Sequence, residues 1–332
     1  MKREWGMERL SRQAALDLAA VMSAAKTRKP PHPYHSPFPL HPSPFPLHHP
    51  LNYRHAFHAG NHADVLKHVV LLALCDALVA KPAACFALDT HAGRGLYRLG
   101  GEEAARSGEA EGGIARLAAS DEPLLARYLA AVAACRAAHG DDAYPGSPWL
   151  LAHALRAQDR IACCELQPDE AAALKRTFAR DPRVAVHARD GYAAMAALLP
   201  PRVGAVRIAR GLVLVDPPYE AQQAEFGIAL AALREGLRRW PGATFALWYP
   251  VKQRRALRAF HRDAARIDAA VLRCELLVRP DDSPLRMNGS GLLLVSPPWK
   301  LDQALGRALP ALCSALGEAG ASWQVDFLRP PA

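Results

Sequence analysis

Short apolar runs alternate with longer amphipathic segments through most of the chain after residue 50. We expect seven strands, at Cys85–Asp89, Arg160–Glu165, Val184–Arg189, Leu212–Val215, Thr244–Tyr249, Val271–Val278 and Gly291–Val295. Segments with helical spacing lie between them, for example Ala63–Ala80, Pro168–Ala179, Ala221–Arg239 and Val251–Ile267. Strands buried on both faces are nearly continuous apolar runs, and strands that alternate with helices form parallel sheets. The pattern therefore predicts an α/β fold with a mostly parallel, doubly wound sheet of seven strands.

Two parts of the chain depart from this alternation. Roughly 70 residues separate Gly95 from Glu165, whereas a complete strand–helix–strand unit needs about 30. Because the interval is rich in Ala, Leu and Arg, we expect an inserted helical subdomain at about 102–146. The second part is residues 30–50, where Pro recurs at almost every second position and SPFPLH occurs twice, at 36–41 and at 43–48. We expect a disordered Pro/His-rich extension over 1–50, followed by one domain at 51–332.

Composition narrows the class of protein. The 332 residues are 51% hydrophobic and 22% charged, as in globular proteins, and no apolar run approaches the roughly 18 residues of a membrane span. The formal net charge is +9, but residues 1–50 carry 7 Lys and Arg against 3 Asp and Glu, which leaves a surplus of only five elsewhere. Nucleic-acid binding would therefore depend on local placement of charge. Seven cysteines without a Cys-x-x-Cys pair, and the lack of an export signal, indicate a reduced, cytoplasmic protein.

A strand followed by a Gly-x-Gly turn occupies Phe86 to Gly95. Glycine allows the backbone to approach a ligand closely, here at Gly93 and Gly95. A dinucleotide fingerprint would need a third glycine at position 98, which is Arg98, so an NAD oxidoreductase is disfavoured. Asp89, which ends the strand, is placed as in S-adenosylmethionine sites, where an acid faces the methionine ammonium group.

Two further acids end strands in the same way. Glu165 is placed to accept hydrogen bonds from ribose hydroxyls, and Asp190, followed by Gly191, could accept from the adenine amine. Asp190 could equally cap the helix that comes after it. Ligands of open α/β sheets bind at the carboxyl ends of the strands, so the three acids together predict one cofactor site.

The segment Asp216-Pro217-Pro218-Tyr219 comes directly after a buried strand. The two prolines remove backbone donors and leave carbonyls free to accept hydrogen bonds. An exocyclic amine is a poor nucleophile because its lone pair is delocalised into the ring. The Asp216 carboxylate and the Pro217 carbonyl, by accepting its two N–H groups, would favour the geometry needed for attack on a sulfonium methyl. The Tyr219 ring could stack on an extruded base, as in base-flipping methyltransferases.

A similar tetrapeptide, Ser296-Pro297-Pro298-Trp299, comes after the strand expected to be the last. Ser296 carries no charge, so we expect a packing motif with Trp299 in the core.

The segment from Tyr53 to His68 contains several histidines before the first strand. No His-Glu-x-x-His motif is present and no cysteine is nearby, so a metal site is disfavoured. Basic and aromatic residues suit phosphate and base contacts, and Asn61 is expected to cap the next helix.

The chain resembles the RlmJ family of bacterial 23S ribosomal RNA adenine-N6 methyltransferases from about Asn52 to near its C-terminus. The blocks that carry the resemblance are YRHAFHAGNHADVLKH, LDTHAGRGLYRLG, EAEGGIARL, YPGSPW, CELQP, RDGY, DPPY, ALWYPV and SPPWKL. It implies a class I, Rossmann-like fold that uses S-adenosylmethionine. It also implies cofactor contacts at His68, His91, Ser147, Glu165, Asp190 and Gly191, a catalytic acceptor at Asp216, and RNA contacts at Tyr53 with His55 and Lys67 close by.

The chain departs from this family in two places. Ser296 stands where the family usually has Asn, and residues 1–50 have no counterpart. We therefore expect Leu51 to be an alternative start.

The expected enzyme flips one adenine of 23S rRNA, naked or in a partly assembled subunit, and methylates N6. We expect a monomer without metal or membrane attachment. A DNA adenine-N6 methyltransferase, which would share Asp-Pro-Pro-Tyr, and a non-catalytic RNA-binding protein on the same fold are the alternatives.

Overall fold

The computed structural model describes residues 55–219, 222–284 and 287–331. The expected extension over 1–50, the proposed start at Leu51 and the expected RNA contact Tyr53 lie outside the described residues. The first described element is the short 3₁₀ helix η1 (His55–Phe57), which leads into α2 (His62–Val79).

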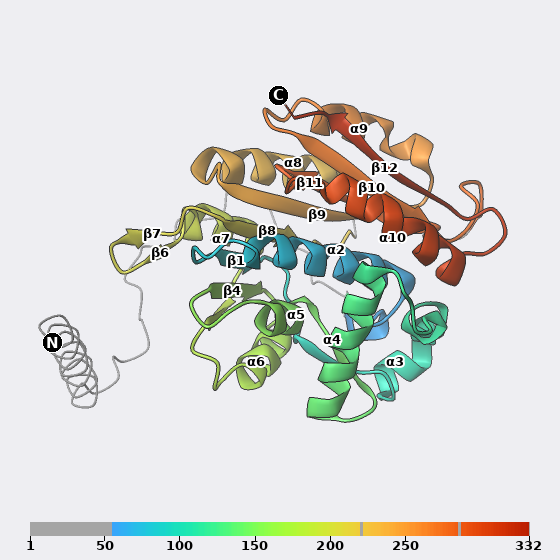
Figure 1. Cartoon of the computed structure of the whole chain (residues 1–332), viewed down its shortest axis with the longest axis horizontal. Helices are drawn as coiled ribbons and strands as arrows, with labels where there is room; N and C mark the ends of the chain where they lie inside the picture. Colours follow the sequence, from blue (N-terminus) through green and yellow to red (C-terminus); the bar gives the residue numbers. More distant parts are fainter. Residues whose placement is uncertain (1–54, 220–221, 285–286, 332) are drawn as a thin grey trace, which may run out of the picture. The chain divides into compact units, whose positions relative to one another are not determined.

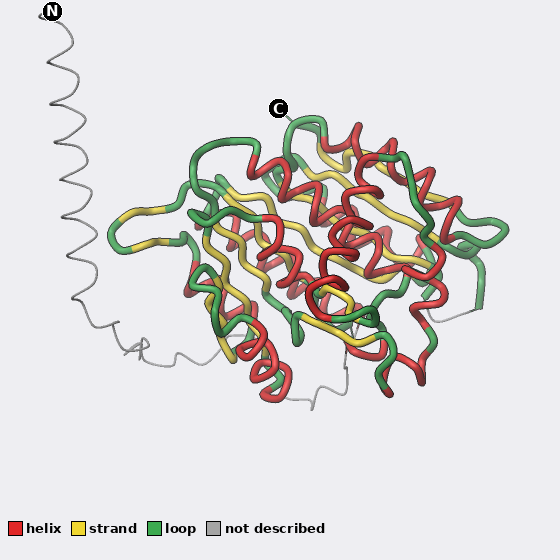
Figure 2. The backbone as a smooth tube through the Cα atoms, turned by 60° about the horizontal axis from the view of Figure 1, so that its bottom comes forward, coloured by secondary structure: helices red, strands yellow, loops and turns green. Residues whose placement is uncertain are grey.

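One large sheet runs through the described part of the chain, with helices on both faces (Figure 1, Figure 2). Its strands are β1 (Phe86–Asp89), β4 (Arg160–Glu165), β5 (Val184–Ala188), β8 (Gly211–Val215), β9 (Ala243–Val251), β10 (Val271–Leu277), β11 (Gly289–Val295) and β12 (Ser322–Arg329). They lie in the order β5-β4-β1-β8-β9-β11-β10-β12. The strands from β5 to β9 are parallel to one another, and β11 is antiparallel to both β9 and β10.

The predicted α/β class with a mostly parallel sheet is confirmed, but the sheet has eight strands where seven were expected. The additional strand, β12, pairs with β10 at the edge of the sheet. Every residue of β12 is at least partly exposed, so it lacks the continuous apolar run by which the central strands were recognised. In contrast, every residue of β1 and β8 is buried.

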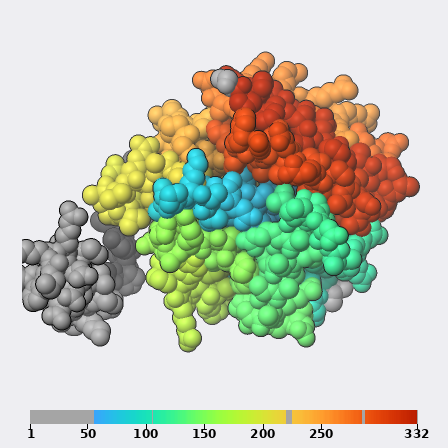
Figure 3. Space-filling model, in the orientation of Figure 1, coloured from blue at the N-terminus to red at the C-terminus, as the bar shows by residue number. Residues whose placement is uncertain are grey.

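Two groups of helices cover the sheet. On one face, α2 contacts α4 (Pro123–His139), α5 (Ser147–Ala154) and α10 (Leu301–Leu316). The space-filling view of this face shows α2 in blue between the green of the 102–146 segment and the red of α10 (Figure 3). The helices α7 (Gly191–Leu198), α8 (Gln222–Arg239) and α9 (Arg258–Ala264) form a second contacting series, while α6 (Pro168–Thr177) contacts β4 and β5.

The segment between β2 (Leu96–Arg98) and β3 (Ala143–Pro145) is mainly helical. It contains α3 (Glu102–Ser107), η2 (Glu109–Gly112), η3 (Ile114–Arg116) and α4, and the antiparallel pairing of β2 with β3 brings its two ends together. Tyr128 and Val132 of α4 belong to the same hydrophobic core as α2. The segment is therefore packed into the main core and is not a detached lobe. A small hairpin, β6 (Arg202–Val203) and β7 (Val206–Arg207), precedes β8.

A helix was predicted at Val251–Ile267, and its predicted start is wrong. Strand β9 continues to Val251, where Pro250 and Val251 lie opposite Ser290 and Gly289 of β11. Only then does the chain form η4 (Arg254–Leu257) and α9. Pairing with a neighbouring strand thus overrides the local helical spacing.

The expectation that Trp299 lies in the core is also wrong, because its side chain is 86% exposed. The core position after β11 is taken by Leu301, which is 5% exposed and whose N–H donates to the Pro298 carbonyl. Ser296 and Lys300 have φ of 53° and 62°, and this left-handed backbone on either side of the prolines turns Trp299 outward. Nor is β11 the last strand, since β12 comes after it.

Truncation of two tryptophans should have very different effects on stability. Trp240 is 1% exposed, and its indole N–H donates to the Ile208 carbonyl at 3.0 Å. Trp240→Ala should lower the free energy of unfolding by roughly 3–5 kcal/mol because it leaves a cavity and an unpaired carbonyl. Trp299→Ala should change it by less than about 0.5 kcal/mol. Urea denaturation of both variants measures this, and equal losses would contradict the two placements.

Candidate active site

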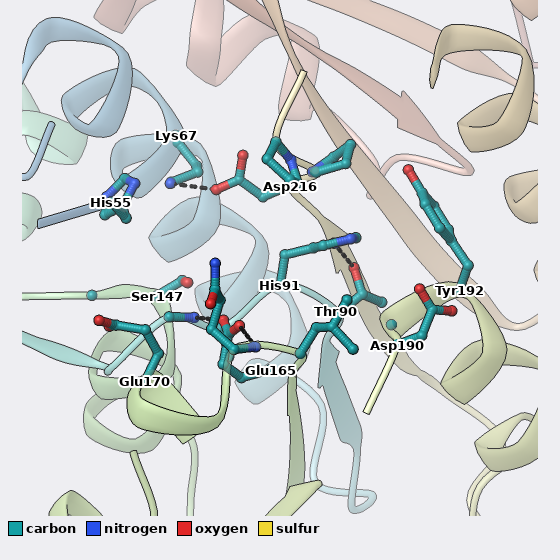
Figure 4. A pocket seen from close by; sticks show the side chains of 18 of the residues that line it. His55, Lys67, Thr90, His91, Ser147, Glu165, Glu170, Asp190, Tyr192 and Asp216 are labelled. Carbon is teal, nitrogen blue, oxygen red and sulfur yellow. Dashed lines mark hydrogen bonds and ion pairs between the residues drawn. The ribbon is translucent and has the colours of Figure 1, made fainter. Parts of the chain in front are cut away.

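A cavity lies at the carboxyl ends of β1, β4, β5 and β8, where the parallel strand order reverses between β1 and β8 (Figure 4). It holds about 1090 Å³ of space that is open to solvent. Most predicted site residues line it: His55, Lys67, His68, His91, Gly93, Ser147, Glu165, Asp190, Gly191, Asp216 and Pro217. Asp89 and Tyr219 are not among its lining residues.

Glu165 ties the loop after β1 to the loop after β4. Its Oε2 accepts from the Gly93 N–H at 2.8 Å and its Oε1 from the Gln167 N–H at 2.7 Å. Gly93 has φ of +59°, and a Cβ there would lie 2.2 Å from the Tyr97 hydroxyl, so the turn requires glycine. Burial raises the pKa of Glu165, although the backbone donors act in the opposite direction. The carboxylate is therefore fixed at the cavity wall with lone pairs left to accept from a ligand.

Asp190 caps a helix and also lies in the cavity wall. Its Oδ1 accepts from the Ala193 N–H at 2.6 Å and caps α7, while the residue also lines the cavity. A Cβ at Gly191 would come within 2.0 Å of the Thr90 carbonyl. Glycine at this position thus allows the start of α7 to approach the end of β1.

Asp89 lies beneath the cavity surface with no exposed area. Its Oδ1 accepts from the His91 N–H at 3.3 Å, and its Oδ2 is buried without a hydrogen-bond partner. Burial raises the pKa of Asp89 to about 6, opposed by a hydrogen bond from the Ser147 hydroxyl. A buried carboxylate oxygen without a donor indicates a site that is completed by a cationic or hydrogen-donating ligand.

Ser147 is the cavity residue that local sequence reasoning alone would place in a turn. In the structure it is the first residue of α5, is 6% exposed and lies beside Asp89. The adjacent Pro148 is typical of the first turn of a helix and could have indicated a helix start.

Two histidines in the cavity wall are uncharged. His68 Nδ1 lies 3.1 Å from the Tyr144 hydroxyl, its Nε2 has no partner, and burial lowers its pKa to about 3. His91 Nδ1 lies 2.8 Å from the Thr90 hydroxyl, and burial lowers its pKa to about 4. Neutral imidazoles suit hydrogen bonding and packing against a nucleoside or thioether group rather than pairing with a phosphate.

Asp216 is joined to α2 by a short ion pair (Figure 4). Lys67 Nζ lies 2.6 Å from Asp216 Oδ2 and 2.9 Å from Asp64 Oδ1. The Lys67 side chain is 5% exposed, and the two carboxylates raise its pKa well above the ordinary value against the effect of burial. Burial alone would raise the pKa of Asp64, but the neighbouring His55 and Lys67 hold it well below its ordinary value. Lys67 was expected to contact RNA, but here it binds the predicted catalytic carboxylate.

A second, smaller cavity lies beside the same ion pair. His55, Lys67 and Asp216 line both cavities, and Trp248 and Met287 line only the second. Tyr219 does not line either one. Its hydroxyl donates to the Trp248 carbonyl at 2.7 Å, and its ring centroid lies 5.8 Å from that of Trp248.

The histidine-rich segment is organised by hydrogen bonds to acids. Asn61 caps α2, as predicted, by accepting from the N–H groups of Ala63 at 3.0 Å and Asp64 at 2.9 Å. His58 Nδ1 lies 2.9 Å from Glu109 Oε1. Within residues 55–331, apart from the two short gaps, no group of three or more His, Cys, Asp or Glu side chains is placed to hold a metal ion. No helix in the described part of the chain combines the length and apolarity needed to cross a membrane.

Comparisons with known proteins show consistent similarities. A family model described as "Ribosomal RNA large subunit methyltransferase D, RlmJ" matches residues 82–329. The ribosomal RNA large subunit methyltransferase J of Haemophilus influenzae is 39% identical over 287 residues, which cover 84% of this chain and 99% of that protein. The protein of the same name from Escherichia coli is 40% identical over 283 residues, which cover 83% and 99%. The crystal structure of protein LPL1258 from Legionella pneumophila has a TM-score of 0.71 at 29% identity, covering 81% of this chain and 98% of that one.

Asp89→Asn should stabilise the ligand-free protein at pH 7.5. Because the folded-state pKa of about 6 exceeds the ordinary 3.8, the ionised carboxylate disfavours folding by up to roughly 3 kcal/mol at that pH. This cost falls as the pH drops through 6, where the folded-state carboxyl takes up a proton, and it disappears below 3.8, where the carboxyl is protonated in both states. Urea unfolding between pH 7.5 and 4.5 should therefore show a stability gain that shrinks on acidification. Asp268→Asn, at a side chain that is 96% exposed, is the control; a variant less stable than the parent at pH 7.5 would contradict the assignment.

Proposed function

Because the chain belongs to the RlmJ family of ribosomal RNA large-subunit methyltransferases, we propose that it methylates N6 of one adenine in 23S rRNA with S-adenosylmethionine as donor. The observation that carries this proposal is the position of Asp216. Its carboxylate lies between a large cavity lined by strand-end acids and a smaller one with an aromatic wall. Cofactor and target base would thus meet at a single carboxylate.

The residues that line the large cavity suit S-adenosylmethionine in their chemistry. Glu165 would accept from the ribose hydroxyls, Asp190 and Gly191 would contact the adenine, and His68 and His91 would pack beside it. Ser147, which lines the cavity above the buried Asp89, would contact the methionine ammonium group, and Asp89 would act on that group from behind Ser147. When bound, the cofactor supplies a methyl group on a sulfonium, an electrophile that an amine lone pair can attack.

Asp216 and Pro217 would hold the amine that attacks. Lys67 binds Oδ2 of Asp216, and among the described residues Oδ1 has no hydrogen-bond partner. Oδ1 and the Pro217 carbonyl can then accept the two N6 hydrogens, which localises the nitrogen lone pair. Transfer would form the N–C bond as the methyl–sulfur bond breaks and the sulfonium becomes a neutral thioether. The same carboxylate would then accept the proton that N6 releases.

The smaller cavity would receive the flipped base. Trp248 supplies its aromatic wall, and Tyr219 fixes Trp248 through the bond to its carbonyl. We propose that the adenine stacks on Trp248, a contact worth roughly 1–3 kcal/mol per base. His55, which is expected to lie close to the RNA, lines both cavities.

The two alternative functions have less support. Family membership favours ribosomal RNA over DNA as substrate. Retention of Glu165, Asp190 and Asp216 around one cavity favours an enzyme over a non-catalytic binding protein.

Asp216→Ala should lower the methyl-transfer rate by at least about 10³-fold, because both acceptor and proton-accepting roles are lost. Cofactor affinity, measured by calorimetric titration, should change only a few-fold because the residues that hold the nucleoside are untouched. Asp268→Ala is the matched control, because this aspartate is 96% exposed and lies just before β10, outside the cavity wall. An Asp216→Ala enzyme that still methylates would refute the catalytic assignment.

Substrate choice can be tested by mass spectrometry of digested nucleic acid. We expect N6-methyladenosine in deproteinised 23S rRNA, less product with a finished large subunit that hides the base, and none with duplex DNA. Methylation should be unaffected by EDTA. Stronger methylation of DNA, or a methyl group on another adenine atom, would exclude the proposed reaction.

A further inference from the structure

Asp64 lies at the centre of a buried network that the proposed reaction does not use directly. Its side chain is 1% exposed and sits in the first turn of α2. Oδ1 binds Lys67 Nζ at 2.9 Å, while Oδ2 accepts from His55 Nε2 at 2.9 Å and from the Gly60 N–H at 3.0 Å. Asp64 thus contacts two features. One is Lys67, the cation that binds Asp216, and the other is the segment before α2, in which His55 is expected to lie close to RNA.

Helix capping accounts for only part of this arrangement. The Gly60 N–H donates to Oδ2 of Asp64, as in a capping box, but Oδ1 binds Lys67 and takes no part in the cap. Nor is Asp64 needed for charge neutrality alone, because Lys67 already has a carboxylate partner in Asp216 at 2.6 Å. Asp64 adds a second charge to the same ammonium group in a region from which water is largely excluded. Such a three-membered ion chain constrains the position of its middle member more than a single pair does.

We propose that Asp64 is a positioning residue that acts on the reaction through Lys67. By holding the ammonium group from the side of α2, it fixes which oxygen of Asp216 is engaged and leaves Oδ1 turned to the target amine. Through Oδ2 it also orders His55 and Gly60, so the same carboxylate couples the entrance segment to the catalytic carboxylate. The proposal rests on the proposed role of Asp216.

Lys67 without Asp64 would not hold its ammonium group at one position on the Asp216 carboxylate. Lysine has four rotatable side-chain bonds, so one ion pair leaves its ammonium group free to shift along the Asp216 carboxylate. A shift of about 1 Å in a group that positions a reactant can cost on the order of 100-fold in rate. Asp64 is three residues before Lys67, and this spacing places both side chains on the same face of α2.

A double-mutant cycle tests the proposal. Asp64→Asn keeps the side-chain shape and removes the charge, and Lys67→Met removes the ammonium group while keeping the stem. We expect Asp64→Asn to lower kcat by on the order of 10- to 100-fold and to leave the calorimetric affinity for S-adenosylmethionine unchanged within about threefold. In the Lys67→Met background, Asp64→Asn should lower kcat no further, because its effect passes through Lys67.

Rates are expressed per cofactor-binding site counted by calorimetry, so that misfolded protein does not lower them. If Asp64 serves only folding, Asp64→Asn will melt at a lower temperature but show the parental kcat, and this overturns the proposal. Equal losses of kcat in both backgrounds also overturn it, because Asp64 would then act independently of Lys67. If Asp64→Asn alone does not fold, Asp64→Asn/Lys67→Met, which removes a buried acid and base together, is compared with Lys67→Met.

Asp216→Asn in the same assay separates this proposal from the one on which it rests. An Asp216→Asn enzyme with the parental kcat would refute the catalytic role of Asp216, on which the role of Asp64 rests. An inactive Asp216→Asn enzyme together with a fully active Asp64→Asn enzyme would refute only the role of Asp64.

Discussion

The ion pair between Lys67 and Asp216 joins residues 149 positions apart and links α2 to the end of β8. A lysine that is 5% exposed loses most of its hydration, and this is tolerable only when carboxylates replace the water. Asp64 and Asp216 do so from α2 and from the end of β8. The apolar residues of α2 pack over the sheet in the register that this pairing requires, and the two cavities lie on either side of it.

Around this pair, the sheet collects carboxylates from chain segments that are far apart. Glu165, Asp190 and Asp216 lie at the ends of three parallel strands or just beyond them, so their side chains converge at one edge. Each also has a structural bond: two backbone amides for Glu165, the α7 cap for Asp190 and Lys67 for Asp216. These bonds hold the acids in place before any ligand arrives, which is the usual requirement of an efficient site.

The two X-Pro-Pro-aromatic segments show why a motif acquires function from its position. Asp216 lies at the end of a strand in the parallel centre of the sheet, next to the switch point. Ser296 lies at the end of β11, which runs antiparallel to β9. The prolines that come after Ser296 therefore lie near the start of β9, away from the carboxyl ends of the parallel strands. There the local backbone turns Trp299 to solvent, whereas Tyr219 is anchored to Trp248 inside the protein.

The sequence alone determined the α/β class, seven of the eight strands of the large sheet and the acids at the strand ends. Those features depend on the periodicity of apolar residues and on the residue types at the end of each strand, and both are local properties of the chain. His68, His91 and Ser147 were predicted only from the resemblance to a family, and all three line the cavity. Only the tertiary structure decided that Lys67 binds Asp216, that Asp89 lies beneath Ser147, that Trp299 faces solvent and that β12 extends the sheet. Each of these depends on contacts between distant segments, where burial and the need to satisfy charges select one partner among many that the sequence leaves open.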